Sequence, residues 1–303
     1  MIYTVTLNPA VDYFVELDEL KPGQVNRSKG EHKAPGGKGI NVSRVLKRLG
    51  HSSETLGFIG GFTGDYIINT LEQEDIATRF VQVDGDTRIN IKMKGAEETE
   101  LNGSSPEVTK NHLDQLMDQM DHLTKDDTLV LAGSVPGTLD KTIYTQWIQR
   151  VKKNGVKVYL DTSGEPLIDA VNAKPTFIKP NHHELSELVG VAIQTPEEAL
   201  PYVKQLVNEG IEYVFVTFAG DGALLGTKEK VLFATTPKGT VINSVGAGDS
   251  TLAGFLASLE KNDSLEDAFR FAVAAGSSTA FSKGFCELTH VQELTKQISI
   301  STW

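Results

Sequence analysis

The segment with the clearest chemical potential is residues 243–250, which reads NSVGAGDS. A β-rich run leads into it and an amphipathic helical run follows, so its glycines lie where a helix begins. Backbone N–H groups at Gly246, Ala247 and Gly248 can converge there on an anion. An acid in such a turn repels a phosphate, but it suits a base that faces an attacking hydroxyl. The segment indicates phosphoryl transfer to an alcohol, with Asp249 as the catalytic base.

Two further expectations concern Asp249. The positive end of the helix dipole favours a carboxylate, so Asp249 should stay ionised and act as a weak base. Proton transfer is then expected late, after the hydroxyl has begun to bond to phosphorus. The alternative is that Asp249 only caps the helix. The local pattern by itself leaves both interpretations open.

A second glycine-rich segment, residues 35–41 (PGGKGIN), opens another helical run. Its glycines permit close approach of a ligand, and Lys38 and Asn41 can donate to hydroxyls or phosphate. A plain junction between a loop and a helix is the competing interpretation. The segment is not a P-loop, because His32 replaces the leading glycine and Gly39 replaces the Ser or Thr. NSVGAGDS is not a Rossmann fingerprint either, because a threonine stands where the third glycine belongs.

Arg88, Asn90 and Lys92 alternate along a strand-like run, so their side chains should project from one face. Two cations beside an amide suit a dianionic sugar phosphate, and Arg27 and Lys38 can complete such a pocket. A solvated strand face is the alternative. The alternation by itself favours the solvated face, and it is the other motifs of the chain that favour a binding site here.

These segments must be positioned by alternating strands and helices. Short apolar runs rich in β-branched or aromatic residues predict buried strands over residues 2–7, 128–132, 156–160, 176–178 and 213–218. Apolar residues at i, i+3, i+4 and i+7 predict helices over residues 42–49, 252–259 and 265–272. The alternation predicts a mainly parallel sheet covered by helices on both faces.

Two segments break this alternation, residues 11–33 and about 82–102. The first mixes polar and apolar residues around a Lys-Pro-Gly turn. In the second, Ile89, Ile91 and Met93 alternate with the three polar residues described above. Both are typical of strands with one solvated face. They predict a small sheet that stands off the main body as a lid.

Composition narrows the classes of function. The 303 residues carry a net charge of −11, which argues against general nucleic-acid binding. The lone cysteine, Cys286, excludes an intramolecular disulfide and suits a reducing cytosol. No signal-peptide pattern is present, so a cytoplasmic protein is expected. No apolar stretch reaches about 18 residues, so no membrane-spanning helix is expected.

Four motifs in order resemble the ribokinase-like (PfkB) carbohydrate kinases over nearly the whole chain. They are residues 6–12 (TLNPAVD), 36–41 (GGKGIN), 179–184 (KPNHHE) and 246–249 (GAGD). The resemblance implies a three-layer α/β/α sandwich with a mainly parallel sheet, forming one kinase domain over residues 1–303. The two irregular segments would be its lid. It also implies that Asp249 is the base.

The resemblance assigns further roles. The sugar phosphate would contact Asp12, Gly36, Gly37, Lys38, Asn41, Arg88, Asn90 and Lys92. The nucleotide phosphates, and Mg²⁺ indirectly, would be supported by Lys179, Asn181 and Glu184. The nucleotide would also lie near Thr217, Gly220, Gly222, Gly246 and Gly248. One departure concerns the nucleotide segment, where Thr217, Phe218 and Ala219 replace the family's usual Ser-Leu-Gly. A monovalent cation such as K⁺ is expected near Asn243 and Val245.

The segments TLNPAVD and residues 87–92 (TRINIK) narrow the resemblance to the phosphosugar branch, which holds 1-phosphofructokinases and tagatose-6-phosphate kinases. The second segment resembles the former more. ATP-dependent phosphorylation of fructose 1-phosphate to fructose 1,6-bisphosphate is implied, with tagatose-6-phosphate kinase as the alternative. A non-catalytic sugar or nucleotide sensor is a third reading, against which the intact Asp249 speaks. The partners are then ATP and a sugar phosphate, with no nucleic acid or membrane, and a homodimer is left open.

Overall fold

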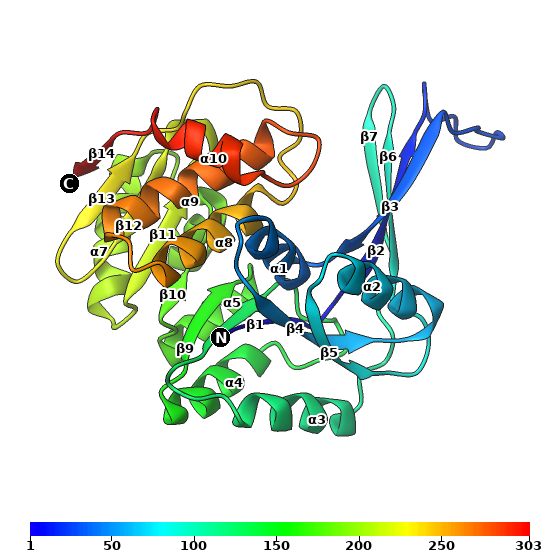
Figure 1. Ribbon diagram of the computed structural model, residues 1–303, viewed down its shortest axis with the longest axis horizontal. Helices are drawn as coiled ribbons and strands as arrows, with labels where there is room; N and C mark the ends of the chain where they lie inside the picture. The colour runs from blue at the N-terminus through cyan, green and yellow to red at the C-terminus, as the bar shows by residue number, and fades with distance from the viewer.

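The computed structural model describes residues 1–303 and is built around a sheet of ten strands (Figure 1). The strands are β1 Ile2–Thr6, β4 Ser53–Ile59, β5 Ala77–Gln82, β8 Thr128–Ala132, β9 Lys157–Asp161, β10 Phe177–Ile178, β11 Tyr213–Thr217, β12 Ala223–Gly226, β13 Val231–Ala234 and β14 Ile300–Thr302. Their order across the sheet is β14-β13-β12-β11-β10-β9-β8-β1-β4-β5. All five strands predicted from the sequence form, and all five belong to this sheet.

The sheet is mainly parallel, as predicted. The run from β5 through β4, β1, β8, β9 and β10 to β11 is parallel throughout. Strands β12, β13 and β14 extend it in antiparallel order. Because parallel strands end at the same edge, the segments that follow β1, β8, β9, β10 and β11 gather along that edge.

Ten helices accompany the strands. They are α1 Lys38–Arg48, α2 Gly61–Gln73, α3 Lys110–Asp121, α4 Ile143–Val151, α5 Glu165–Ala170, α6 His182–Val189, α7 Pro196–Asn208, α8 Ala247–Glu260, α9 Leu265–Ala280 and α10 Leu288–Thr295. Helices α1, α8, α9 and α10 share one buried cluster with the sheet, and α3, α4, α5 and α7 share another on its opposite face (Figure 1). The three-layer α/β/α fold is therefore confirmed. None of the helices combines the length and the apolar character that a membrane crossing requires.

A second, small sheet projects from the main body (Figure 1). Its strands are β2 Ala10–Glu16, β3 Gly30–Gly36, β6 Ile89–Lys94 and β7 Glu98–Asn102, in the order β3-β2-β6-β7. Strands β2 and β6 pair in parallel, which sets Asp12 beside Asn90 and Phe14 beside Lys92. The start of the second irregular segment lies elsewhere, because Gln82 ends β5 in the main sheet.

Candidate active site

A cavity of about 980 Å³ lies along the edge where the parallel strands end, and it also reaches the small sheet and the start of α8. Most of the predicted site residues line it: Asp12, Gly37, Lys38, Asn41, Arg88, Asn90, Lys92, Lys179, Asn181, Glu184, Thr217, Gly220, Gly222, Gly246, Ala247, Gly248 and Asp249. The fold thus brings together motifs that are far apart in the sequence. Of the residues predicted to contact the substrates, Arg27 and Gly36 do not line the cavity, and neither does Asn243, which was predicted near a monovalent cation.

The turn before α8 presents backbone N–H groups as predicted, with one exception. Gly246 has a φ of 79°, in the left-handed region that favours glycine. The N–H groups of Gly246, Gly248 and Asp249 have no backbone partner. The Ala247 N–H instead donates to the Ser244 carbonyl at 3.2 Å. It is therefore not the free anion donor that the sequence pattern predicted, because the turn uses it to close on itself.

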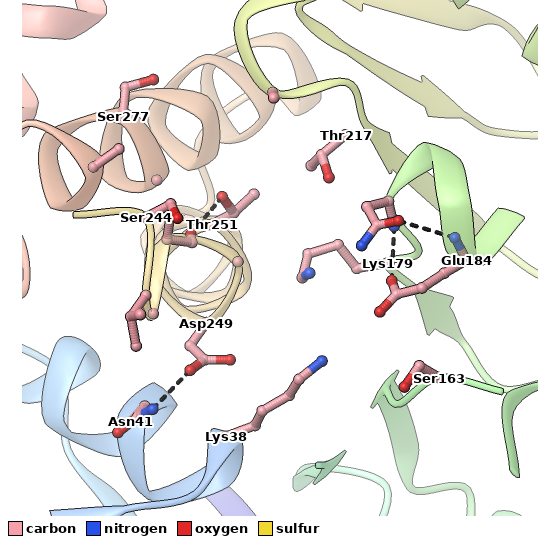
Figure 2. A pocket seen from close by; sticks show the side chains of 18 of the residues that line it. Lys38, Asn41, Ser163, Lys179, Glu184, Thr217, Ser244, Asp249, Thr251 and Ser277 are labelled. Carbon is pink, nitrogen blue, oxygen red and sulfur yellow. Dashed lines mark hydrogen bonds between the residues drawn. The ribbon is translucent and has the colours of Figure 1, made fainter. Parts of the chain in front are cut away.

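Asp249 is buried at the start of α8 and makes no side-chain cap for that helix. Its Oδ2 accepts a hydrogen bond from Asn41 Nδ2 at 2.8 Å. Figure 2 shows its carboxylate facing the space into which Lys38 also points. The capping alternative therefore does not describe this residue, which lies on the cavity wall and is held by α1.

The electrostatic setting of Asp249 corrects the expectation of a weak base. Burial raises the pKa of Asp249 to about 6, and the negative charge of Asp161 adds to the rise. The charge of Lys38, the Asn41 hydrogen bond and the charge of Lys179 act in the opposite direction. Desolvation outweighs the helix dipole because the dipole supplies only partial charge at the first turn. Asp249 is thus ionised near pH 7 and is a stronger base than a surface carboxylate.

Asp161, at the end of β9, was not predicted and lies under the cavity floor. Its carboxylate is buried, with Oδ1 2.9 Å from Lys38 Nζ and Oδ2 3.1 Å from Lys179 Nζ. Burial would raise the pKa of Asp161, but the two lysines outweigh it and hold the pKa below its ordinary value. Conversely, Asp161 and then Asp249 raise the pKa of Lys38 against the effect of its burial. Lys38 therefore stays charged.

The KPNHHE motif forms the start of α6. The Asn181 side chain accepts from the Glu184 N–H at 2.9 Å, and Glu184 Oε2 accepts from the Asn181 N–H at 2.8 Å. This capping box fixes the loop beside the cavity. It also gives both side chains a structural role beyond the predicted indirect support of magnesium. No group of three or more His, Cys, Asp or Glu residues converges into a metal cage.

The part of the cavity that was predicted to hold the sugar carries a polar strip from the small sheet. Asn90 Nδ2 donates to Asp12 Oδ1 at 3.0 Å, and the buried Asn90 Oδ1 has no partner. Lys92 Nζ lies 3.8 Å from Asp12 Oδ2. Gly36 contributes by its lack of a side chain, because a Cβ atom there would lie 2.5 Å from Asp12 Oδ2. It makes room for the Asp12 carboxylate instead of contacting the cavity.

Arg88 lies in the cavity wall just before β6, whereas Arg27 lies elsewhere. The Arg88 guanidinium donates to the Asn8 carbonyl at 3.2 Å and to the Pro9 carbonyl at 3.4 Å. It is thereby oriented by the backbone that follows β1. Arg27 is exposed in the loop between β2 and β3. The prediction that it completes the pocket is not met within one chain, because its loop extends from the small sheet into solvent.

The part of the cavity that was predicted to hold the nucleotide begins at the end of β11. Thr217 is tied to the KPNHHE loop, since its N–H donates to the Pro180 carbonyl at 3.2 Å. Ala219, which replaces the family's usual glycine, has a φ of 51°. The backbone at Ala219 therefore keeps the left-handed conformation that favours glycine, and the alanine side chain makes this conformation strained. Val241, Val245 and Phe281 also line the cavity and add apolar surface to it.

Several lining residues were given no role of their own in the sequence analysis. Ser134 and Ser163 follow the predicted strands β8 and β9, and Asn8 follows β1. Asn8 Nδ2 donates to Ser134 Oγ at 3.3 Å. Their signal was positional: each lies just beyond a predicted parallel strand, where ligands bind in open α/β sheets.

A parallel sheet with a glycine turn, a buried carboxylate and flanking lysines at its carboxyl edge defines the class of sugar kinases that lack a P-loop. The model of the pfkB family of carbohydrate kinases matches residues 5–290. The chain belongs to this family.

Two of the similar proteins are named as kinases of phosphorylated sugars. The chain is 50% identical over 301 residues to a 1-phosphofructokinase of Bacillus subtilis, covering 99% of each chain. It is 39% identical over 302 residues to a D-tagatose-1-phosphate kinase of Bacillus licheniformis, again covering 99% of each.

Solved structures of Escherichia coli phosphofructokinase-2 share the fold. A complex with substrates and products aligns with a TM-score of 0.92 at 30% identity, covering 97% of this chain and 98% of that one. That enzyme has also been solved in complex with potassium and in a tetrameric inhibited form.

Proposed function

We propose that this kinase transfers the γ-phosphoryl group of ATP to fructose 1-phosphate and produces fructose 1,6-bisphosphate and ADP. The observation that carries the proposal is the position of Asp249, between the free N–H groups of the GAGD turn and a polar strip with two cations, Arg88 and Lys92. One end of the cavity suits a nucleotide phosphate, and the other suits a second, sugar-bound phosphate. The 50% identity to a 1-phosphofructokinase supports the same substrate.

The reaction follows from the geometry around Asp249. The 6-hydroxyl of the sugar would lie against this carboxylate, and its oxygen would attack the γ-phosphorus of ATP as the bond to ADP breaks. The hydroxyl proton passes to Asp249. The N–H groups of Gly246 and Gly248 and the ammonium groups of Lys38 and Lys179 stabilise the negative charge on the transferring group.

The phosphate that the substrate already carries would bind at the far end of the polar strip. Arg88 offers a planar guanidinium suited to two parallel hydrogen bonds, and Lys92 adds a point charge. Because backbone carbonyls already orient Arg88, little side-chain entropy remains to be lost on binding. Asp12 and Asn41 would accept and donate hydrogen bonds to the sugar hydroxyls.

We propose that the enzyme also uses Mg²⁺ and a monovalent cation. Mg²⁺ commonly binds through one or two carboxylates together with substrate phosphates, and it neutralises phosphate charge. A cavity with Glu184 nearby and no closed metal cage fits that mode. Potassium would bind beside Asn243 and Val245, and a monovalent cation at some site is supported by the potassium complex of the E. coli relative. Activity measured in potassium and in sodium salts would test this.

We also propose that the protein forms one kinase domain and assembles as a homodimer. We take residues 1–303 as one kinase domain in which the small sheet closes over the sugar, because Asp12, Asn90 and Lys92 reach the cavity from it. A homodimer is proposed from the tetrameric form of the E. coli relative. Light scattering of the purified protein tests this assembly.

A ketose phosphorylated at another position is the alternative substrate. The sequence left tagatose 6-phosphate open, whereas the relative named for tagatose acts on the 1-phosphate. That relative favours a phosphate at C1. A sensor without activity is disfavoured, because binding alone does not need a base with its pKa raised to about 6 at the phosphoryl site.

The test measures ADP release with fructose 1-phosphate, fructose 6-phosphate, tagatose 1-phosphate, tagatose 6-phosphate and unphosphorylated fructose. Fructose 1-phosphate should give the highest kcat/KM. Arg88→Ala should raise its KM by roughly 10- to 150-fold, the equivalent of one charge-assisted contact, and leave the KM for ATP unchanged. Arg88→Lys should recover part of the loss. Equal effects on fructose and fructose 1-phosphate would show that Arg88 does not bind the phosphate.

A further inference from the structure

Asp161 joins two lysines that come from different parts of the chain. Lys38 is the first residue of α1, and Lys179 follows β10. Each ammonium pairs with a different oxygen of the Asp161 carboxylate, at 2.9 and 3.1 Å. Neither lysine has another acidic partner within ion-pair distance. The carboxylate therefore fixes the separation of the two ammonium groups.

The two lysines serve opposite sides of the reaction centre. Lys38 lies one turn before Asn41, which holds Asp249. Lys179 Nζ lies against the glycine turn, because a Cβ atom at Gly248 would be 3.1 Å from it. Both lysines line the cavity (Figure 2). Asp161 does not line it. Asp161 is thus close enough to control both cations and too deep to touch the substrates.

We propose that Asp161 is a positioning residue that holds Lys38 and Lys179 in register for the transferring phosphoryl group. A lysine has a flexible four-carbon stem, so without a fixed partner its ammonium samples many positions. A buried carboxylate with one oxygen for each lysine removes that freedom before the substrates bind. The inference rests on the proposed kinase function and deepens it.

The same carboxylate acts on the base at a distance. After burial, the negative charge of Asp161 is the second cause of the raised pKa of Asp249. Neutralising Asp161 should therefore lower the pKa of Asp249, because only the cations would then remain near it. A residue that merely filled space would leave this pKa unchanged, so the pH dependence of the rate separates the two roles.

Asp161→Asn is the first test variant. A carboxamide has one acceptor oxygen in place of two, so one lysine must lose its partner. We expect kcat to fall by roughly 10- to 150-fold, the equivalent of one charge-assisted contact. The acidic limb of the pH profile should move to lower pH. Asp161→Glu keeps the charge but displaces the oxygens, so it should lower kcat and leave the acidic limb in place.

Two further variants separate the positioning role of Asp161 from a general effect on folding. Asp161→Asn combined with Lys179→Met restores the balance of buried charge, and it should be no slower than Lys179→Met alone, because the two residues act as a unit. Asp169→Asn is the control, since Asp169 bonds to Thr145 away from the cavity. It should behave like the parent. Circular dichroism and thermal unfolding establish that each variant folds.

Several results would overturn the inference. They are a kcat within twofold of the parent for Asp161→Asn, an unmoved acidic limb, or losses that multiply in the double variant. Recovery of the parent rate at raised magnesium concentration would likewise show that Asp161 acts on the metal instead of the lysines. All rates are compared on the phosphorylated sugar that the parent turns over fastest. An error in the proposed substrate therefore leaves this test intact.

Discussion

At the scale of single residues, the position of the Asp249 carboxylate determines how strong a base it can be. Asp249 is 5% exposed, and the negative charge of Asp161 lies close enough to oppose its ionisation. A carboxylate in water would be a poor acceptor for a sugar hydroxyl proton. Raising its pKa toward the working pH improves the transfer while the ionised form still dominates.

The pH dependence of the rate should report this directly. Because the carboxylate is the active form, kcat/KM should decline as pH falls through about 6, where Asp249 takes up a proton. Asp249→Asn should lower kcat by about 10²- to 10⁴-fold with ATP still bound. Rates from pH 5 to 9, corrected for the measured titration of the sugar phosphate, provide the check. Near-normal turnover in Asp249→Asn would remove Asp249 as the base.

Ala219 offers a second prediction at this scale. Its left-handed φ of 51° disfavours any side chain by about 1–2 kcal/mol, whereas glycine accepts it freely. Ala219→Gly should therefore leave stability unchanged or raise it by up to about 1 kcal/mol. Ala192→Gly, at an exposed position without positive φ, should lower it. Urea unfolding compares the two, and a clear loss in Ala219→Gly would contradict the strain.

At the scale of elements, the site depends on how α1 meets α8. Helix α1 brings Lys38 and Asn41 to the start of α8, and the loop after α9 closes over the same junction. Phe285 in that loop packs on the glycine turn, since a Cβ atom at Gly246 would lie 2.5 Å from its ring. The Arg44 guanidinium lies 5.3 Å from the ring centroid, and Arg48 donates to the Phe285 carbonyl at 3.0 Å.

Removing the Phe285 ring should therefore loosen the turn that carries the N–H donors. Phe285→Ala should reduce stability by about 1–3 kcal/mol, below the usual loss for a fully buried ring because this one is half-buried. It should lower kcat more than it raises either KM, since the donors act mainly in the transition state. Phe285→Leu should recover most of both. A stability loss with unchanged kcat would show that the ring only supports packing.

At the scale of the whole molecule, the cavity lies between a large rigid body and a thin sheet. The main sheet is covered on both faces, whereas the small sheet projects from it with few buried residues (Figure 1). The proposed sugar ligands come from both parts, because Asp12 and Lys92 belong to the small sheet and Asn41 belongs to the body. Substrate binding should therefore draw the two together.

Hydrogen exchange tests this closure. With fructose 1-phosphate bound, strands β2, β3, β6 and β7 should gain protection, while β8 in the buried sheet should change little. Closure should also exclude water, which otherwise competes for the phosphoryl group. Hydrolysis of ATP without sugar should then be slow. Unchanged exchange throughout residues 10–36 and 89–102 would mean that the small sheet is not a lid.

Much of this protein was determined by local patterns in its sequence. Strand and helix periods predicted the main sheet, and the glycines of residues 246–249 predicted a helix start with free donors. These features depend on neighbours within a few residues, so spacing alone reveals them. The alternation of Arg88, Asn90 and Lys92 likewise placed three polar side chains in one wall.

Only the tertiary structure decided how these parts act on one another. The hydrogen bond between Asn41 and Asp249 spans 208 residues, and the pair of Lys38 with Asp161 spans 123. Asp161 ends an ordinary buried strand, so nothing in its neighbourhood marks it, and Arg27 gave no sign that its loop leads away from the cavity. The basicity of Asp249 depends on burial and on the charges of three residues that are distant in the sequence, Asp161, Lys38 and Lys179. Such quantities arise from packing across the fold, because electric fields and desolvation follow distance in space and not separation along the chain.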